Sequence, residues 1–268
     1  MSIGKSRGRD TVCLVVDQPN PIKVLWGILG VLRTVSPPNP VGAGRVDHEG
    51  LAPTLSALGN GGLASARVEA AGLRDYIAKM SEAEPDMLAP SEALAFWINL
   101  YNAGAVELAI EAWKSGAESV LRMPNGFNRS IVSVAGENLS LDAIEHAKIR
   151  RFKDPRIHAA LVCGSLSCPT LRSTPYNGVD LDRQLDDQMR AFLANGGSIA
   201  GINGEVLLSR VFLWYGGDVA RPQRMPVFIP TRGPTLLNAI RKWLPEELKS
   251  AEKLGFQEYD WSLACSIA

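Results

Sequence analysis

The stretch that decides the fold is Ser91–Trp113, which reads SEALAFWINLYNAGAVELAIEAW. Ser91 is expected to cap the free backbone amides of a helix, and Glu92 in the first turn complements the helix dipole. At the rotation of a helix, large apolar side chains point in nearly every direction. We therefore predict a central helix that is covered on most sides by Leu94, Phe96, Trp97, Ile98, Leu100, Tyr101, Leu108 and Ile110.

One narrow strip of this helix is different, because it carries two amides among small side chains. Asn99 and Asn102 lie there with Ala95, Ala103 and Val106. Buried amides need hydrogen-bond partners within the protein. We expect both asparagines to be buried and hydrogen-bonded to the loop that follows a strand predicted at residues 156–163.

The remaining patterns alternate between helix and strand signals. Ile131–Leu141 predicts a hairpin, and Asn203-Gly204 between apolar runs predicts a second hairpin with a type I′ turn. Helices are expected from Ser140, from Asp180 and from Pro234 to Trp243, and Arg156–Cys163 is interpreted as a buried strand. The expected fold class is α+β, with the central helix packed on a small β-sheet and surrounded by other helices.

Length and composition favour one large domain with an appended arm. The chain has 268 residues, of which 46% are hydrophobic and 21% are charged, so a sizeable core can form. Residues 1–45 are rich in Gly, Pro, Ser and Arg, and Ser36–Pro40 cannot continue a helix. We therefore expect a poorly ordered arm over residues 1–45 and one globular domain over residues 46–268.

Charge and hydropathy exclude several partner classes. Lys and Arg total 28, and Asp and Glu total 28, so no net field is available to attract nucleic acid. No apolar run is long enough to span a membrane, and the longest is Val24–Leu32. We expect a cytoplasmic protein. Export is the alternative, because that run and the small residues Val41–Ala43 resemble parts of a signal peptide.

Several ordered blocks resemble the family named domain of unknown function 547. The resemblance covers residues from about 46 to 264. It gives a map of positions, since the family carries no reaction that could be transferred to this chain. The blocks are FWINLYNA at 96–103, IEH at 144–146, DPRIH at 154–158, CG at 163–164 with SCP at 167–169, LSRVFLWY at 208–215 and YDWSL at 259–263.

Two histidines and two cysteines form the one combination of nucleophile and base within these blocks. His146 and His158 precede Cys163 and Cys168, and an imidazole can activate a thiol as a nucleophile. Three alternatives remain open. All four residues are structural, they bind zinc, or the two cysteines form a disulfide in an exported protein.

The predicted strand separates the candidate pairs. If residues 156–163 are a regular strand, His158 and Cys163 point to opposite faces at about 16 Å and cannot form a dyad. Cys168 precedes Pro169, which suits the first turn of a helix, and a helix N-terminus lowers the pKa of a thiol. Cys168 is thus the preferred nucleophile, with His158 or His146 as base and Asn99 or Asn102 as an orienting amide or oxyanion donor.

The leading hypothesis is a thiol-dependent hydrolase or transferase with a Cys/His centre. It needs no cofactor and no metal, and its substrate would be a small molecule or a peptide. The competing hypothesis is a non-catalytic module that binds a protein partner, in which the same Cys/His cluster only stabilises the core. The two hypotheses differ in one structural property, because an enzyme needs Cys168 or Cys163 open to a cleft beside an imidazole, whereas a binding module does not.

Overall fold

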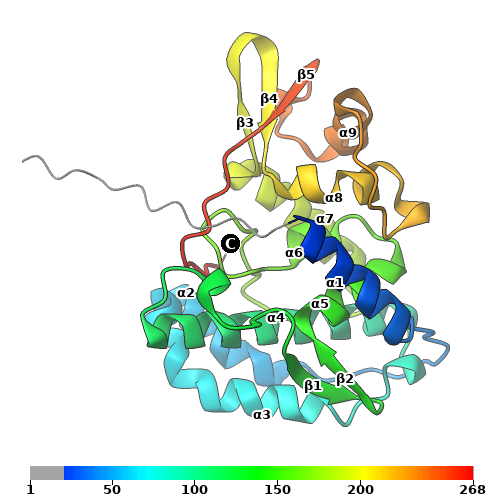
Figure 1. Cartoon of the computed structure of the whole chain (residues 1–268), viewed down its shortest axis with the longest axis vertical. Coiled ribbons are helices and arrows are strands. Elements are labelled where there is room, and N and C mark those ends of the chain that lie inside the picture. The colour runs from blue at the N-terminus through cyan, green and yellow to red at the C-terminus, as the bar shows by residue number, and fades with distance from the viewer. Residues whose placement is uncertain (1–20, 268) are drawn as a thin grey trace, which may run out of the picture.

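The computed structural model describes residues 21–267, and Figure 1 shows helices at one end of the molecule and a small sheet at the other. The helices are α1 (Pro21–Thr34), α2 (Ala52–Ala66), α3 (Ala70–Met80), α4 (Pro90–Ser115), α5 (Leu141–Ala143), α6 (Ile157–Ala160), α7 (Leu181–Phe192), α8 (Val211–Ala220) and α9 (Gly233–Ile240). The strands are β1 (Ser130–Val134), β2 (Glu137–Ser140), β3 (Ser198–Ala200), β4 (Glu205–Leu208) and β5 (Lys253–Phe256). The α+β class is confirmed.

Helix α4 is the central element that the sequence predicts. It is long and apolar enough to cross a membrane, but 94% of its most apolar stretch is buried inside the protein. Its start differs from the expectation, because Ala89 occupies the N-cap and Pro90 the first turn, so Ser91 caps nothing. At the other end Gly116 takes the left-handed conformation, with φ of 74°, that commonly terminates a helix.

The two sheets are both small. Strands β1 and β2 form the predicted hairpin, and the other sheet has the order β3-β4-β5, with β4 and β5 parallel. The type I′ turn is confirmed, since Asn203 and Gly204 have φ values of 55° and 74°. Helix α4 packs against other helices, chiefly α2, α3, α5 and α7, and at Gly104 it also meets Ile131 of β1.

The predicted strand Arg156–Cys163 is wrong, because its first half is the short helix α6 and its second half is a loop. The side chain of Asp154 accepts a hydrogen bond from the Arg156 amide, and its carbonyl accepts one from Ile157, so a turn starts the helix. The loop satisfies its backbone groups on the Asn102 side chain instead of on a neighbouring strand. The strand parity that separated His158 from Cys163 consequently does not apply.

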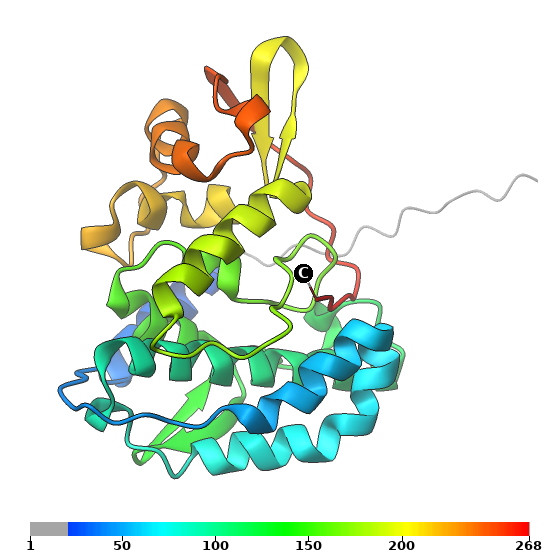
Figure 2. The ribbon, with the colours of Figure 1, turned by 180° about the vertical axis from the view of Figure 1, so that it is seen from behind.

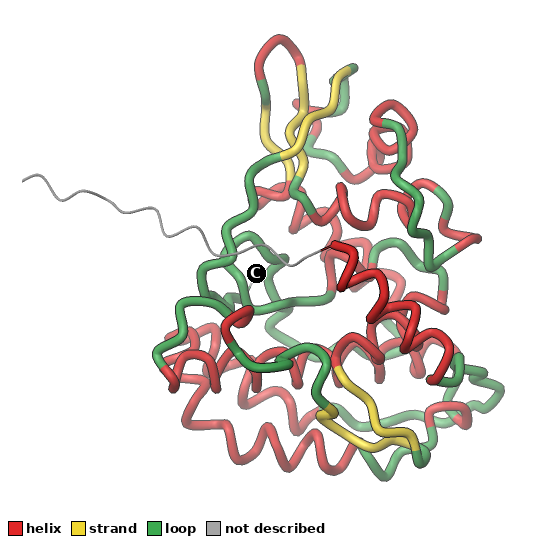
Figure 3. The backbone as a smooth tube through the Cα atoms, in the orientation of Figure 1, coloured by secondary structure: helices red, strands yellow, loops and turns green. Residues whose placement is uncertain are grey.

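Two hydrophobic cores meet at α6. One core lies around α2, α3, α4 and α5, and the other lies among α7, α8, α9 and β4. Ala160 belongs to the first core and its neighbour Ala159 to the second. The residues just before and after α6 are therefore placed at the junction of the two cores, where the loops of Figure 3 converge.

The arm expected over residues 1–45 is not separate from the domain in its described part. Residues 1–20 lie outside the described residues. Helix α1 lies against α5 and the segment 144–148, with Ile28 buried. The chain after α1 is fixed at Ser36, whose amide donates to Glu137 and whose carbonyl accepts from the Lys148 ammonium.

The segment 259–267 returns to the middle of the molecule and runs along residues 163–171. Four backbone hydrogen bonds join the two segments, from the amides of Leu166, Ser167, Leu171 and Ala264 to the carbonyls of Ser262, Asp260, Ser266 and Gly164. Figure 2 shows this C-terminal segment (red) beside the loop that follows α6. We call residues 259–267 the C-terminal strap.

Candidate functional site

A buried ionic network surrounds Asp218, a residue of α8 with no exposed surface. Its carboxylate accepts hydrogen bonds from Arg150 Nε at 2.8 Å and Nη2 at 3.1 Å, and from the Val227 amide at 2.6 Å. His158 Nε2 lies 2.9 Å from the same carboxylate. Burial opposes the charge of Asp218, but the hydrogen bonds and charges of His158 and Arg150 outweigh it, and the pKa of Asp218 is strongly lowered.

His146 joins this network through Arg150. Arg150 Nη1 lies 3.1 Å from His146 Nδ1, and because a guanidinium can only donate, that nitrogen must accept. Burial lowers the pKa of His146 to about 4, so the ring is neutral at pH 7. His146 is thus a fixed acceptor for Arg150 and has little capacity to hold a proton at neutral pH.

His158 is positioned, but it does not reach a thiol in this structure. Its ring stacks on Tyr215 with centroids 4.1 Å apart, and Asp218 holds Nε2. Within residues 21–267, no hydrogen bond links either His146 or His158 to Cys163 or Cys168. The structure therefore brings the two histidines together around Arg150 and Asp218, and it brings the two cysteines together elsewhere.

Cys163 is the thiol with the more acidic environment. Its Sγ lies 3.1 Å from Ser165 Oγ and 3.3 Å from the Tyr259 hydroxyl, and these two hydroxyls are 2.9 Å apart. A hydrogen bond from the Cys168 thiol is the largest influence on Cys163, and with those of Ser165 and Tyr259 it outweighs burial and lowers the pKa to about 7. This environment therefore favours the thiolate of Cys163 more than water does for an ordinary cysteine.

Cys168 has the opposite acidity, so the expected lowering of its pKa is wrong. Pro169 does not start a helix, and Cys168 therefore caps none. Its Sγ accepts a hydrogen bond from the Cys163 amide at 2.8 Å. Burial and the neighbouring Cys163 thiol raise the pKa of Cys168 well above that of a free thiol.

A polar cleft of about 160 Å³ opens beside Cys168. It lies between the loop after α6, the end of α7 and the segment that leaves β5. Its walls are formed by Leu166, Ser167, Cys168, Phe192, Asn195, Gly196, Gly197, Ser209, Gln257 and Glu258. Cys168 borders this cleft, whereas neither Cys163 nor a histidine is among its lining residues.

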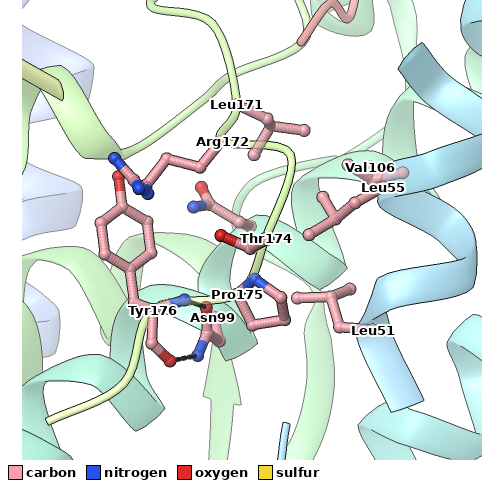
Figure 4. Close-up of a pocket in the computed structure, with 10 residues that line it drawn as sticks. Leu51, Leu55, Asn99, Val106, Leu171, Arg172, Thr174, Pro175 and Tyr176 are labelled. Atoms are coloured by element: carbon pink, nitrogen blue, oxygen red, sulfur yellow. Dashed lines mark hydrogen bonds between the residues drawn. The ribbon is translucent and has the colours of Figure 1, made fainter. Parts of the chain in front are cut away.

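Asn99 and Asn102 are buried and hydrogen-bonded, as predicted, but only Asn99 binds the loop after residues 156–163, since the partners of Asn102 lie within that segment. Asn99 exchanges two hydrogen bonds with the backbone of Tyr176, and Asn102 binds the Ala160 carbonyl and the Val162 amide. Figure 4 shows Asn99 and Tyr176 at a hollow whose free volume is about 10 Å³, room for about one water molecule. The two amides hold the loop that carries the cysteines and do not face the cleft.

Three contributors to the site were missed by sequence reasoning. Asp218 and Arg150 have no local signal for their pairing, since 68 residues separate them. Tyr259 begins the last of the ordered sequence blocks, but only the fold shows that its hydroxyl meets Cys163. In the described residues Cys163, Cys168 and Cys265 are free thiols, and no three His, Cys, Asp or Glu side chains are grouped to hold a metal ion. Cys13 lies outside that range.

Comparison with known protein families adds one match, over residues 85–193. The matching family is described as protein of unknown function, DUF547. Residues 85–193 belong to this family. The DUF547 segment includes α4, α6 and both cysteines of the site, but it stops before Asp218 and Tyr259. Neither the curated proteins nor the solved structures contain a match to the chain.

Proposed function

We propose that this protein is a thiol-dependent transferase and that Cys163 is its nucleophile. The observation that supports it is the pair of hydroxyls at the Cys163 sulfur, with Ser165 at 3.1 Å and Tyr259 at 3.3 Å, beside the Cys168 thiol. These donors stabilise a thiolate without an imidazole, and the thiolate is the reactive form of cysteine. The role that the sequence suggested for Cys168 passes to Cys163.

Group transfer fits this geometry better than hydrolysis does. Hydrolysis needs a base to activate water, and among the described residues no imidazole is bonded to either thiol. Transfer between sulfur atoms needs only the thiolate, with a rate that is highest when the pKa is near the ambient pH. A pKa of about 7 for Cys163 meets that condition.

The proposed reaction transfers an acyl group from a thioester to a second thiol. The Cys163 thiolate attacks the carbonyl carbon, the new carbon–sulfur bond forms, and the donor leaves as a thiolate. The acceptor thiolate then attacks the acyl group on Cys163 and restores the free thiolate of the protein. Ser165 and Tyr259, which hold the Cys163 sulfur, would orient it during both steps.

The competing hypothesis of a structural cluster is supported for the histidine half alone. Arg150 and Asp218 are 1% and 0% exposed, and they bind His146, His158 and Val227. A buried and satisfied network of this kind fixes a single arrangement of the core. We therefore assign His146 and His158 a structural role beneath the cysteine loop.

The experiment is the formation of a covalent acyl intermediate, read by mass. The protein is mixed with a small acyl thioester at pH 7.5, quenched in acid and mapped by peptide. The acyl group is expected on Cys163 in the wild type and in Cys265→Ser, a matched control because Cys265 is the other described thiol outside the pair. Cys163→Ser should carry none.

Alkylation gives an independent measurement of the same acidity. Iodoacetamide should modify Cys163 faster than Cys168 at pH 7, with a midpoint near pH 7 for Cys163. Faster labelling of Cys168, or an acyl group that persists in Cys163→Ser, would overturn the assignment.

A further inference from the structure

Three aromatic rings pack together beside the proposed nucleophile. The ring centroids of Tyr259 lie 4.8 Å from Trp214 and 4.6 Å from Trp261, and the two tryptophans are stacked at 5.7 Å. Trp214 comes from α8, whereas Tyr259 and Trp261 belong to the C-terminal strap. We call these three residues the aromatic platform.

The platform is open to solvent on its Trp214 side. Trp214 is 42% exposed, and its neighbour Leu213 is 45% exposed. Aromatic side chains of this size are usually covered, and an exposed group of them commonly marks a binding surface. The part of the Trp214 ring that is not covered by Trp261 and Tyr259 is thus available to a ligand, with Leu213 exposed beside it in the chain.

Tyr259 connects the platform to the thiol. Its ring packs against both tryptophans, and its hydroxyl lies 3.3 Å from Cys163 Sγ. The Tyr259 side chain therefore bridges the Trp214 ring and the sulfur. This arrangement suits the recognition of a substrate group that adjoins the reacting bond.

The charges around the platform indicate which group it would accept. Glu258 and Asp260 flank Tyr259, and both are exposed. Arg210 pairs with Glu258 at 3.2 Å, which leaves the carboxylate of Asp260 without a basic partner among the described residues. Hydrogen bonds from Ser262 lower the pKa of Asp260 and keep it ionised. Electron-rich ring faces beside a free carboxylate favour a cation.

We propose that the aromatic platform binds a cationic group of the substrate, an ammonium or a guanidinium, next to the bond that Cys163 attacks. The inference rests on the proposed transfer reaction for its link to chemistry, but the binding itself is independent of turnover. It names a substrate class, which is an acyl donor or acceptor that carries a positive charge.

The experiment titrates the full-length protein with tetramethylammonium chloride and follows tryptophan fluorescence at constant ionic strength. Tert-butyl alcohol, which has a similar shape and no charge, is the control ligand. A saturable change is expected for the cation, with the alcohol at least about tenfold weaker, as a cation–π contact of ordinary strength implies.

Two platform variants and one distant variant make the result specific. Trp214→Leu keeps an apolar surface and removes the ring, and it should weaken the cation by about tenfold. Asp260→Asn should weaken it by roughly threefold, as expected for one exposed charge. Trp113→Phe changes another exposed tryptophan, 39% exposed on α4, and should leave the affinity unchanged.

The outcomes separate this inference from the proposed function. Equal binding of the alcohol and the cation, or a Trp214→Leu protein that binds the cation normally, would overturn the platform as a cation site. Cys163→Ser should still bind tetramethylammonium. Cation binding without any acyl intermediate would support the cation site and reject the transferase. Acylation of Cys163 without a preference for cationic thioesters would support the transferase and reject the cation site.

Discussion

Replacing Asp218 by Asn tests the buried network most directly. Asparagine keeps the shape and an acceptor for the Val227 amide, but it removes the negative charge that Arg150 and His158 face. Arg150 is 1% exposed, and its Nε would lose its charged acceptor, while its other nitrogens would keep the asparagine Oδ1, the Val227 carbonyl and a neutral His146. Removing one partner of a buried ion pair costs about 3–5 kcal/mol.

Urea denaturation measures this cost, because the midpoint shifts by the change in free energy of unfolding divided by the slope. With a slope of about 3 kcal/mol/M, a loss of about 3 kcal/mol lowers the midpoint by about 1 M. The matched control is Asp187→Asn, whose carboxylate forms an exposed i,i+4 pair with Arg183. Its cost should stay below about 0.5 kcal/mol.

The pH dependence of the stability also tests the role of the Asp218 charge. The folded pKa of Asp218 is lowered, so its stabilisation is present above the unfolded pKa of about 3.9 and declines as the pH falls below it. The gap between wild type and Asp218→Asn should hold from pH 8 to pH 5 and narrow below about pH 4. A cost under about 1 kcal/mol at pH 7, or a gap that widens in acid, would refute the reasoning.

Three further changes have defined outcomes. Asn102→Leu leaves the Ala160 carbonyl and the Val162 amide unpaired, and chemical denaturation should show a loss of about 2 kcal/mol; a neutral result would mean that water replaces the amide. The pKa of His146 is about 4 in the folded protein and 6.5 for a free imidazole, so the unfolded chain binds the extra proton and stability falls as the pH drops from 6.5 to 4. His146→Gln should flatten this dependence of stability on pH by up to about 1.4 kcal/mol per pH unit, and an unchanged slope would contradict the reasoning. Gly164→Ala introduces a side chain at a φ of 77° and places its Cβ 2.9 Å from a Val120 methyl group. It should destabilise the loop by about 1 kcal/mol and slow the alkylation of Cys163. Equal labelling rates in the wild type and the variant would show that the loop adapts.

The sequence predicts α4 and its amide strip well because both depend on local periodicity. A side chain at each position of a helix has a fixed direction, so the burial of Asn99 and Asn102 and their need for partners follow from the pattern. The same is true of the Asn203-Gly204 turn, in which both residues take positive φ.

The prediction of a strand at residues 156–163 is wrong for a physical reason, since a short apolar run has no periodicity that separates a strand from a helix. The choice is made by Asp154, whose side chain starts a turn, and by Asn102, which binds the following backbone from another helix. The acidity of the two cysteines was reversed for a similar reason. Tyr259 lies 96 residues from Cys163, and no local pattern contains that contact.

The C-terminal strap also links the reactivity of the thiol to the order of synthesis. Cys163 is made and leaves the ribosome well before Tyr259, because synthesis proceeds from the N-terminus. Until the strap folds back, the sulfur lacks one of the hydroxyls that lower its pKa. A nascent chain therefore keeps this cysteine closer to an ordinary, slowly reacting thiol, and its full acidity develops only after the strap has folded back.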